Sequence, residues 1–170
     1  MAVVPLKPKS VAVDTNVLFD LANGDEEAHL ALAVIRARLP NVNVVVTPTV
    51  VQELSWLAEH ADEPETKRLA ILAATSLEKW GISAANCRSV MHGIIEQAAN
   101  EISRRGLIPP NEVHDALIVA EASSAQCSML ISTDGHMWKA DFTVLNGVLV
   151  GRDLYPIVLV SPRKIIKDYG

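Results

Sequence analysis

The chain has 170 residues, of which 49% are hydrophobic and only 4% aromatic, and its net charge is −5. Such a length predicts one domain over residues 1–170, large enough to bury an aliphatic core without disulfides or a structural metal. The acidic balance argues against a protein that coats duplex nucleic acid non-specifically, because such binding needs a dense basic surface. The acidic balance does not exclude a nuclease, since acids gathered around a metal lower the net charge.

The sequence shows no sign of membrane insertion, secretion or a zinc site. No apolar run approaches the roughly 20 residues that span a bilayer. Residues 1–10 hold two prolines and two lysines but no apolar segment of signal-peptide length, so we expect a flexible N-terminal extension on a cytoplasmic protein without membrane partners. Cys87 and Cys127 form no CxxC motif and share no ligand spacing with the five histidines, so both thiols are expected to be free and buried.

In the N-terminal half, short β-branched runs alternate with segments of helical periodicity. Capping residues and breakers set the expected ends of the helices. The expected elements are a strand over 11–13, a short helix over 17–22 ended by Asn23-Gly24, a helix from the N-cap Asp25 up to Pro40, a strand over 43–46, and a helix from the N-cap Thr47 to about His60.

The C-terminal half continues this alternation, which implies a parallel sheet covered by helices on both faces. We expect a helix from Pro64 to Trp80-Gly81, a helix from about Ala84 to Arg105 stopped by Gly106, a helix over Glu112 to Ala125 capped by Asn111, a strand over 127–131, extended segments over 143–150 and 155–160, and a short helix from Ser161-Pro162 through Lys167.

Two of the expected strands end in polar residues. Asp14-Thr15-Asn16 follows the first strand, and Ser132-Thr133-Asp134 follows the strand that ends at Ile131. In open parallel sheets ligands bind at the carboxyl ends of the strands. Asp14 and Asp134 are therefore expected on the same side of the sheet, although each by itself could simply cap the following turn.

Two further acids share the apolar faces of helices. Glu53 borders a stripe of core-facing residues, and Asp115 has the spacing of Ile118, Val119 and Ala122. Either acid alone has an ordinary explanation, because Glu53 could reach water and Asp115 could stabilise the helix start. Neither has a lysine or arginine within a helical turn, however, and an unpaired buried carboxylate is costly. Four such acids are typical of an oxygen cage for Mg²⁺ or Mn²⁺.

These motifs together resemble the PIN-domain family of metal-dependent ribonucleases, and most of all its compact prokaryotic members, which include the toxin halves of toxin-antitoxin pairs. The resemblance covers about Val11 to Ile166, and Val160-Ser161-Pro162 is similar to the family's ending. The residues that carry it are Asp14-Thr15-Asn16, Glu53, His114-Asp115-Ala116-Leu117-Ile118 and Ser132-Thr133-Asp134.

The resemblance implies a fold, an activity and partners. It implies a central parallel sheet in the order 3-2-1-4-5 and endonucleolytic cleavage of single-stranded or structured RNA. It also implies one or two Mg²⁺ or Mn²⁺ ions on Asp14, Glu53, Asp115 and Asp134, with Asn16 and Ser132 in support. A homodimer and a protein antitoxin are further expectations. The acidic charge and the long segment from Gly147 to Pro156 depart from the simplest members.

Two other functions compete with this interpretation. A PIN-like module could bind RNA or protein without cutting, although a pure binder has no use for a desolvated acidic cluster. A phosphotransferase of the haloacid-dehalogenase type also ends its first strand in aspartate, but that chemistry needs a second Asp where this chain has Asn16. His136 is a candidate for substrate contact. The candidates for phosphate contact are Arg36, Arg38, Lys67, Arg68, Arg104, Arg105 and Lys139.

Overall fold

The structure, a computed structural model that describes residues 9–170, contains one parallel sheet in the order β3-β2-β1-β4-β5. The order implied by the family resemblance is thus confirmed. Most of the expected N-terminal extension lies outside the described residues, and Ser10 already belongs to β1. The strands are β1 (Ser10–Val13), β2 (Asn43–Val46), β3 (Ile82–Ala84), β4 (Cys127–Ile131) and β5 (Val158–Val160).

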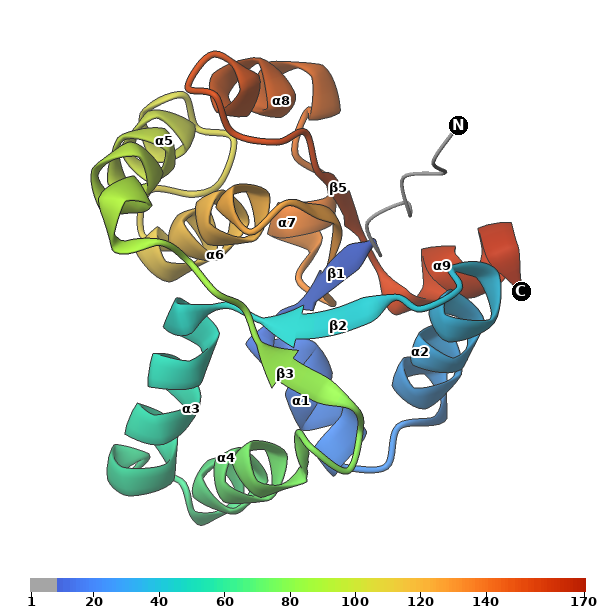
Figure 1. Cartoon of the computed structure of the whole chain (residues 1–170). Coiled ribbons are helices and arrows are strands. Elements are labelled where there is room, and N and C mark those ends of the chain that lie inside the picture. Colours follow the sequence, from blue (N-terminus) through green and yellow to red (C-terminus); the bar gives the residue numbers. More distant parts are fainter. Residues whose placement is uncertain (1–8) are drawn as a thin grey trace.

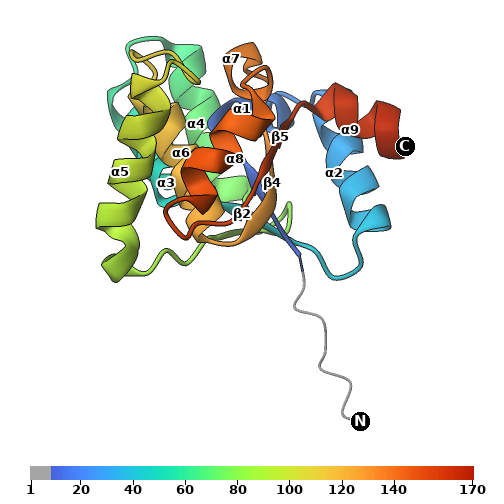
Figure 2. The same ribbon diagram turned by 90° about the horizontal axis from the view of Figure 1, so that it is seen from above.

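Helices cover both faces of the sheet. α5, α6 and α8 gather on one side, and α2 and α9 lie on the other (Figures 1 and 2). Among the described residues no helix combines the length and hydrophobicity needed to cross a membrane. The helices are α1 (Thr15–Ala22), α2 (Glu26–Arg38), α3 (Pro48–His60), α4 (Pro64–Ser76), α5 (His92–Arg104) preceded by the 3₁₀ turn η1 (Ser89–Met91), α6 (Val113–Ser124), α7 (Gly135–Trp138), α8 (Phe142–Val150) and α9 (Pro162–Tyr169).

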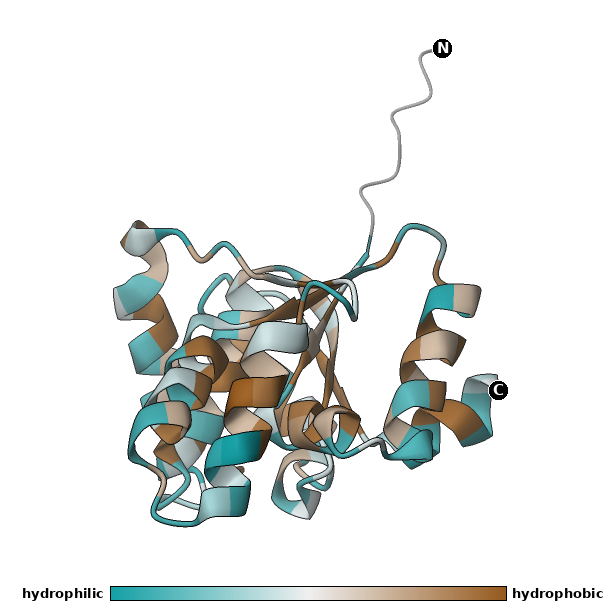
Figure 3. Ribbon diagram, turned by 90° about the horizontal axis from the view of Figure 1, so that it is seen from below, coloured by the Kyte–Doolittle hydropathy of each residue, from teal (hydrophilic) through white to brown (hydrophobic). Residues whose placement is uncertain are grey.

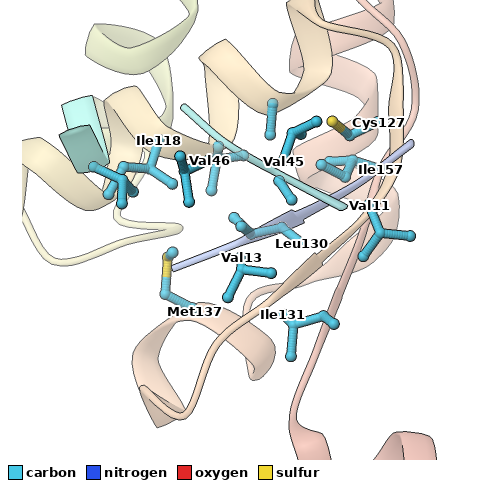
Figure 4. Packing of buried hydrophobic residues seen from close by; sticks show 14 of the residues in the cluster. Val11, Val13, Val45, Val46, Ile118, Cys127, Leu130, Ile131, Met137 and Ile157 are labelled. Atoms are coloured by element: carbon cyan, nitrogen blue, oxygen red, sulfur yellow. The ribbon is translucent and has the colours of Figure 1, made fainter. Parts of the chain in front are cut away.

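The core is aliphatic, as the composition predicts. The strands are the most hydrophobic elements, and the helices turn hydrophilic residues outward (Figure 3). Val11, Val13 and Ile131 are fully buried and form its centre (Figure 4). Cys127 is buried and Cys87 half-buried, both as free thiols. Burial raises the pKa of Cys127 to about 12 and that of Cys87 to about 11, so neither is a ready nucleophile.

Helix ends follow the local sequence closely in the N-terminal half. The Asp25 carboxylate accepts a hydrogen bond from the Ala28 amide at 2.8 Å and so caps α2. Thr47 caps α3, with Pro48 at the first helical position. Gly24 has a φ of 77°, a conformation that glycine adopts without strain, and separates α1 from α2.

The expected strand over residues 143–150 is wrong, because this segment forms α8. Its β-branched residues suggested extended structure, yet its buried residues Leu145, Val148 and Leu149 recur at helical spacing. The Asp141 carboxylate also caps the helix by accepting a hydrogen bond from the Val144 amide at 2.9 Å. The last extended segment is shorter than expected, since only Val158–Val160 pairs with β4.

The boundaries between α4 and α6 also differ from expectation. α4 ends at Ser76, and the next residues lead into β3, an edge strand of three residues that pairs with β2. The helix expected from Ala84 begins only at His92, after η1, because residues 82–84 are used by the sheet. Asn111 is not the N-cap of α6; Glu112 occupies that position without a capping hydrogen bond from its side chain.

Candidate active site

Asp14 and Ser132 lie side by side because β1 and β4 are neighbours. The register pairs Val13 with Ile131, so the next residue of each strand reaches the same carboxyl edge of the sheet. The Ser132 hydroxyl donates a hydrogen bond to Oδ2 of Asp14 at 2.8 Å, and the Thr15 amide donates to Oδ1 at 2.7 Å. Asp14 is only 2% exposed. Its carboxylate is thus fixed in place without a basic partner among residues 9–170.

Glu53 joins this site through Thr15. The Thr15 hydroxyl donates a hydrogen bond to Oε2 of Glu53 at 2.8 Å and links the start of α1 to α3. Thr15 is buried, whereas Glu53 is partly exposed. The sequence motif contains Thr15, but its role in orienting Glu53 was missed, because it depends on a contact between residues 38 positions apart.

Ser132 also connects Asp14 to Asp134. The Asp134 amide donates a hydrogen bond to the Ser132 hydroxyl at 3.0 Å, and Asp134 is the N-cap of α7. Its carboxylate accepts from the His136 amide at 2.8 Å and lies 3.6 Å from Nδ1 of His136. One serine hydroxyl therefore links the Asp14 carboxylate to the backbone of Asp134.

Asp115 lies in the first turn of α6 and completes the group. Among residues 9–170 no hydrogen bond or ion pair holds its carboxylate. Burial, followed by the charges of Asp14 and Asp134, raises its pKa to about 7, and Glu112 and Glu53 add smaller effects. Glu112 is a contributor that the sequence analysis missed.

The pKa of Asp14 is raised for similar reasons. Burial raises its pKa to about 6, the hydrogen bonds from Ser132 and Thr15 oppose this, and the charges of Glu53 and Asp134 add to it. These effects require the four predicted acids to lie within electrostatic reach of one another. Asn16, in contrast, is exposed in the first turn of α1 and has no hydrogen bond from its side chain to the described residues.

A fifth acid, Glu121, is structural and was also missed. Its carboxylate is buried in the interface between α6 and α3, where it accepts hydrogen bonds from the Thr49 amide at 3.0 Å and the Thr49 hydroxyl at 2.8 Å. This contact satisfies the first turn of α3. It also fixes the two helices that carry Glu53 and Asp115 relative to each other.

Comparison with known families identifies the family of the chain. The model of the PIN domain family matches residues 11–142. The chain belongs to the PIN domain family. No curated protein matches the chain significantly.

Solved structures share the fold of this PIN domain. VapBC2 from Rickettsia felis bound to a DNA fragment from their promoter has a TM-score of 0.62 at 13% identity, over 89% of this chain and 98% of that one. VapBC-1 from nontypeable Haemophilus influenzae has a TM-score of 0.57 at 14% identity, over 91% of this chain and 98% of that one. DNA-bound VapBC from Salmonella typhimurium has a TM-score of 0.53 at 15% identity, again over 91% of this chain and 98% of that one. At these identities the likeness is one of fold.

The donor set of the PIN domain suits a hard divalent cation. All four acids offer oxygen ligands, and among residues 9–170 none of Asp14, Glu53 and Asp115 is paired with a lysine or arginine. Among the described residues, however, no three or more His, Cys, Asp or Glu side chains lie close enough together to hold a metal ion as they stand.

Most of the cations proposed to contact phosphate contact the protein itself. Arg36 donates to the Trp80 and Gly81 carbonyls, Arg38 to the Tyr169 carbonyl, Lys67 to the Glu59 carbonyl, Arg68 to the Glu65 carboxylate, and both Arg104 and Arg105 to the Glu101 carboxylate. Lys139 differs, because its ammonium group lies 5.1 Å from the centre of the Trp138 ring, close to Asp134 in sequence.

Proposed function

We propose that this PIN domain is a metal-dependent endoribonuclease that hydrolyses RNA phosphodiester bonds. Its site comprises Asp14, Glu53, Asp115 and Asp134, and Mg²⁺ or Mn²⁺ is the cofactor. The observation that supports this most strongly is the raised pKa of Asp14 and Asp115 beside two further carboxylates at the carboxyl edge of the sheet. Natural folds retain such uncompensated charge where a functional site needs it.

Each residue has a distinct task in this proposal. Ser132 and Thr15 hold the Asp14 and Glu53 carboxylates through their hydroxyl groups, so the ligands do not have to be ordered when the site forms. A bound divalent cation would lower the pKa of the attacking water and stabilise charge on the transferring phosphate. Asp115 has no competing hydrogen bond among the described residues, so its carboxylate would be available to the cation and its water.

The partners proposed with this function are RNA, a protein antitoxin and a second copy of the chain. The VapBC structures that share the fold support the toxin assignment. Exposed apolar side chains on α3 and α4 support a protein partner, among them Trp56, which is 58% exposed, and Ile71, which is 47% exposed. Light scattering coupled to size exclusion tests the homodimer, and co-expression with the product of the adjacent gene tests the antitoxin.

A second candidate is a non-catalytic PIN-like module that binds RNA or protein. The absence of a closed group of metal ligands among the described side chains favours it. The two candidates differ in a simple respect, because only the nuclease needs a metal and an intact Asp115.

The test is cleavage of a panel of labelled RNAs by three proteins, each supplied with Mn²⁺, Mg²⁺ or EDTA. They are the wild type, Asp115→Asn and the control Asp141→Asn, which alters only the exposed N-cap of α8. We expect metal-dependent cleavage by the wild type and the control and none by folded Asp115→Asn. Full activity of Asp115→Asn, or a folded wild type that cuts no RNA with either metal, would reject the nuclease.

A further inference from the structure

Trp138 and Lys139 lie at the end of α7, the short helix whose N-cap is Asp134. They follow Asp134 within the same turn-rich segment, and both side chains fold back over Gly135, the residue directly after Asp134. A β-carbon placed on Gly135 would lie 3.7 Å from the indole and 3.8 Å from the Lys139 ammonium nitrogen. The indole ring and the positive charge therefore lie over the residue that follows Asp134, one of the four proposed ligands.

The Trp138 ring is not needed to anchor α7. Met137 serves that purpose, since it is fully buried and points into the hydrophobic core (Figure 4). Trp138 is 39% exposed, so part of its indole ring is accessible to a ligand. An exposed indole next to a site for phosphodiester chemistry has an evident use, because every nucleobase has a flat face that can stack on it.

Lys139 adds the charge that such a contact needs. Within residues 9–170 its ammonium group has no carboxylate partner and lies instead over the Trp138 ring, at 5.1 Å from the ring centre. The protein carries a net charge of −5, and Asp134, one of the four proposed ligands, is the N-cap of the same short helix. A cation at this position offsets the repulsion between those acids and an approaching phosphate.

We propose that Trp138 and Lys139 form a subsite for one unpaired nucleotide next to the phosphodiester bond that is cut. The nucleobase stacks on the indole, and the Lys139 ammonium group contacts a flanking phosphate. This inference rests on the proposed function, since it assigns the substrate of the same site. It also requires the base at this position to be unpaired, because a base inside a duplex has no free face for the indole.

Binding without cleavage separates this inference from the nuclease activity. Oligouridylate, oligoadenylate, a matched RNA duplex and an abasic oligomer of the same length are titrated in excess EDTA. The proteins are the wild type, Trp138→Ala, Trp138→Phe, Lys139→Ala and the control Trp80→Phe. This control alters a ring in the turn before β3, the edge strand opposite β5. Circular dichroism confirms that each variant is folded.

Tryptophan fluorescence gives a second, independent measurement. The chain has three tryptophans, so the variant Trp56→Phe/Trp80→Phe leaves Trp138 as the sole reporter. Stacking of a base on its indole quenches this emission. A contact with phosphate alone does not, so the abasic oligomer should leave the signal unchanged.

The expected results follow from the strength of stacking. Trp138→Ala should weaken binding of the single strands about 5- to 100-fold, Trp138→Phe much less, and Trp80→Phe not at all. Lys139→Ala should weaken single strands and the abasic oligomer alike. Wild-type affinity in Trp138→Ala, absence of quenching in the sole-Trp138 variant, or equal binding of duplex would overturn the subsite. If the wild type cuts RNA in the presence of metal but the expected binding results are not obtained, the nuclease is supported and the subsite is rejected. If the binding results are obtained but no RNA is cut, only the nuclease is rejected.

Discussion

The buried Asp14 carboxylate should destabilise the metal-free fold as the pH rises. Its pKa increases from the usual 3.8 to about 6 on folding, chiefly through burial. Between these values the folded state keeps a proton that the unfolded state has already lost, so the contribution of Asp14 to the free energy of unfolding is most favourable below pH 4 and declines through pH 6. One pH unit corresponds to about 1.4 kcal/mol, and the shift is therefore worth about 3 kcal/mol at pH 8.

Replacing Asp14 with Asn removes this cost and the proposed function together. In EDTA, Asp14→Asn should gain about 1–3 kcal/mol over the wild type at pH 8, less what is lost in hydrogen bonding to Ser132 and Thr15. The same variant should cut no RNA, because one ligand is gone. Greater stability with lost activity is the pattern expected of a strained functional residue.

The assay is urea unfolding of the wild type, Asp14→Asn and the control Asn16→Ala from pH 4 to pH 8. The decisive quantity is the stability difference between Asp14→Asn and the wild type, which should grow with pH, whereas the difference for the exposed, uncharged Asn16 position should not. A stability difference for Asp14→Asn that stays constant over this range would refute the reasoning, since it would show that folding does not raise the pKa of Asp14.

Two further predictions follow from the hydrogen bonds around the site. Ser132→Ala loses the bonds to Asp14 and Asp134, so it should lower the free energy of unfolding by about 1–3 kcal/mol and RNA cleavage by about 10- to 100-fold; cleavage at the wild-type rate would show that Ser132 does not orient the acids. Thr49→Val leaves the buried Glu121 short of one donor and should cost about 1–3 kcal/mol in urea unfolding, with cleavage by the folded protein retained. Unchanged stability of Thr49→Val would contradict the structural role of Glu121.

Local chemistry in the sequence was sufficient to predict the strand-end acids. Asp14 and Asp134 follow runs of buried aliphatic residues, and parallel strands deliver their carboxyl ends to one edge of a sheet. Asp115 was found because it departs from the apolar face that it shares. In each case the pattern lies within a single element, where periodicity is a reliable guide.

Contacts between distant elements could not be predicted in this way. The bond from Thr15 to Glu53 and the one from Thr49 to Glu121 depend on how α1, α3 and α6 pack. The assignment of residues 143–150 to a strand failed because β-branched composition was given more weight than the spacing of Leu145 and Val148 and the cap at Asp141. β3 was missed because three residues at a sheet edge carry no periodicity of their own.

Direct titration with Mn²⁺ tests the central claim, that these acids form a metal site. Calorimetry or the Mn²⁺ paramagnetic signal would give the affinities of the wild type, Asp115→Asn and the control Asp141→Asn at several pH values. The account predicts binding by the wild type and the control that strengthens from pH 5 to pH 8, because Asp14 and Asp115 must lose protons first, and at least tenfold weaker binding by Asp115→Asn. Equal Mn²⁺ affinity of Asp115→Asn and the wild type, or no binding at pH 8, would contradict it.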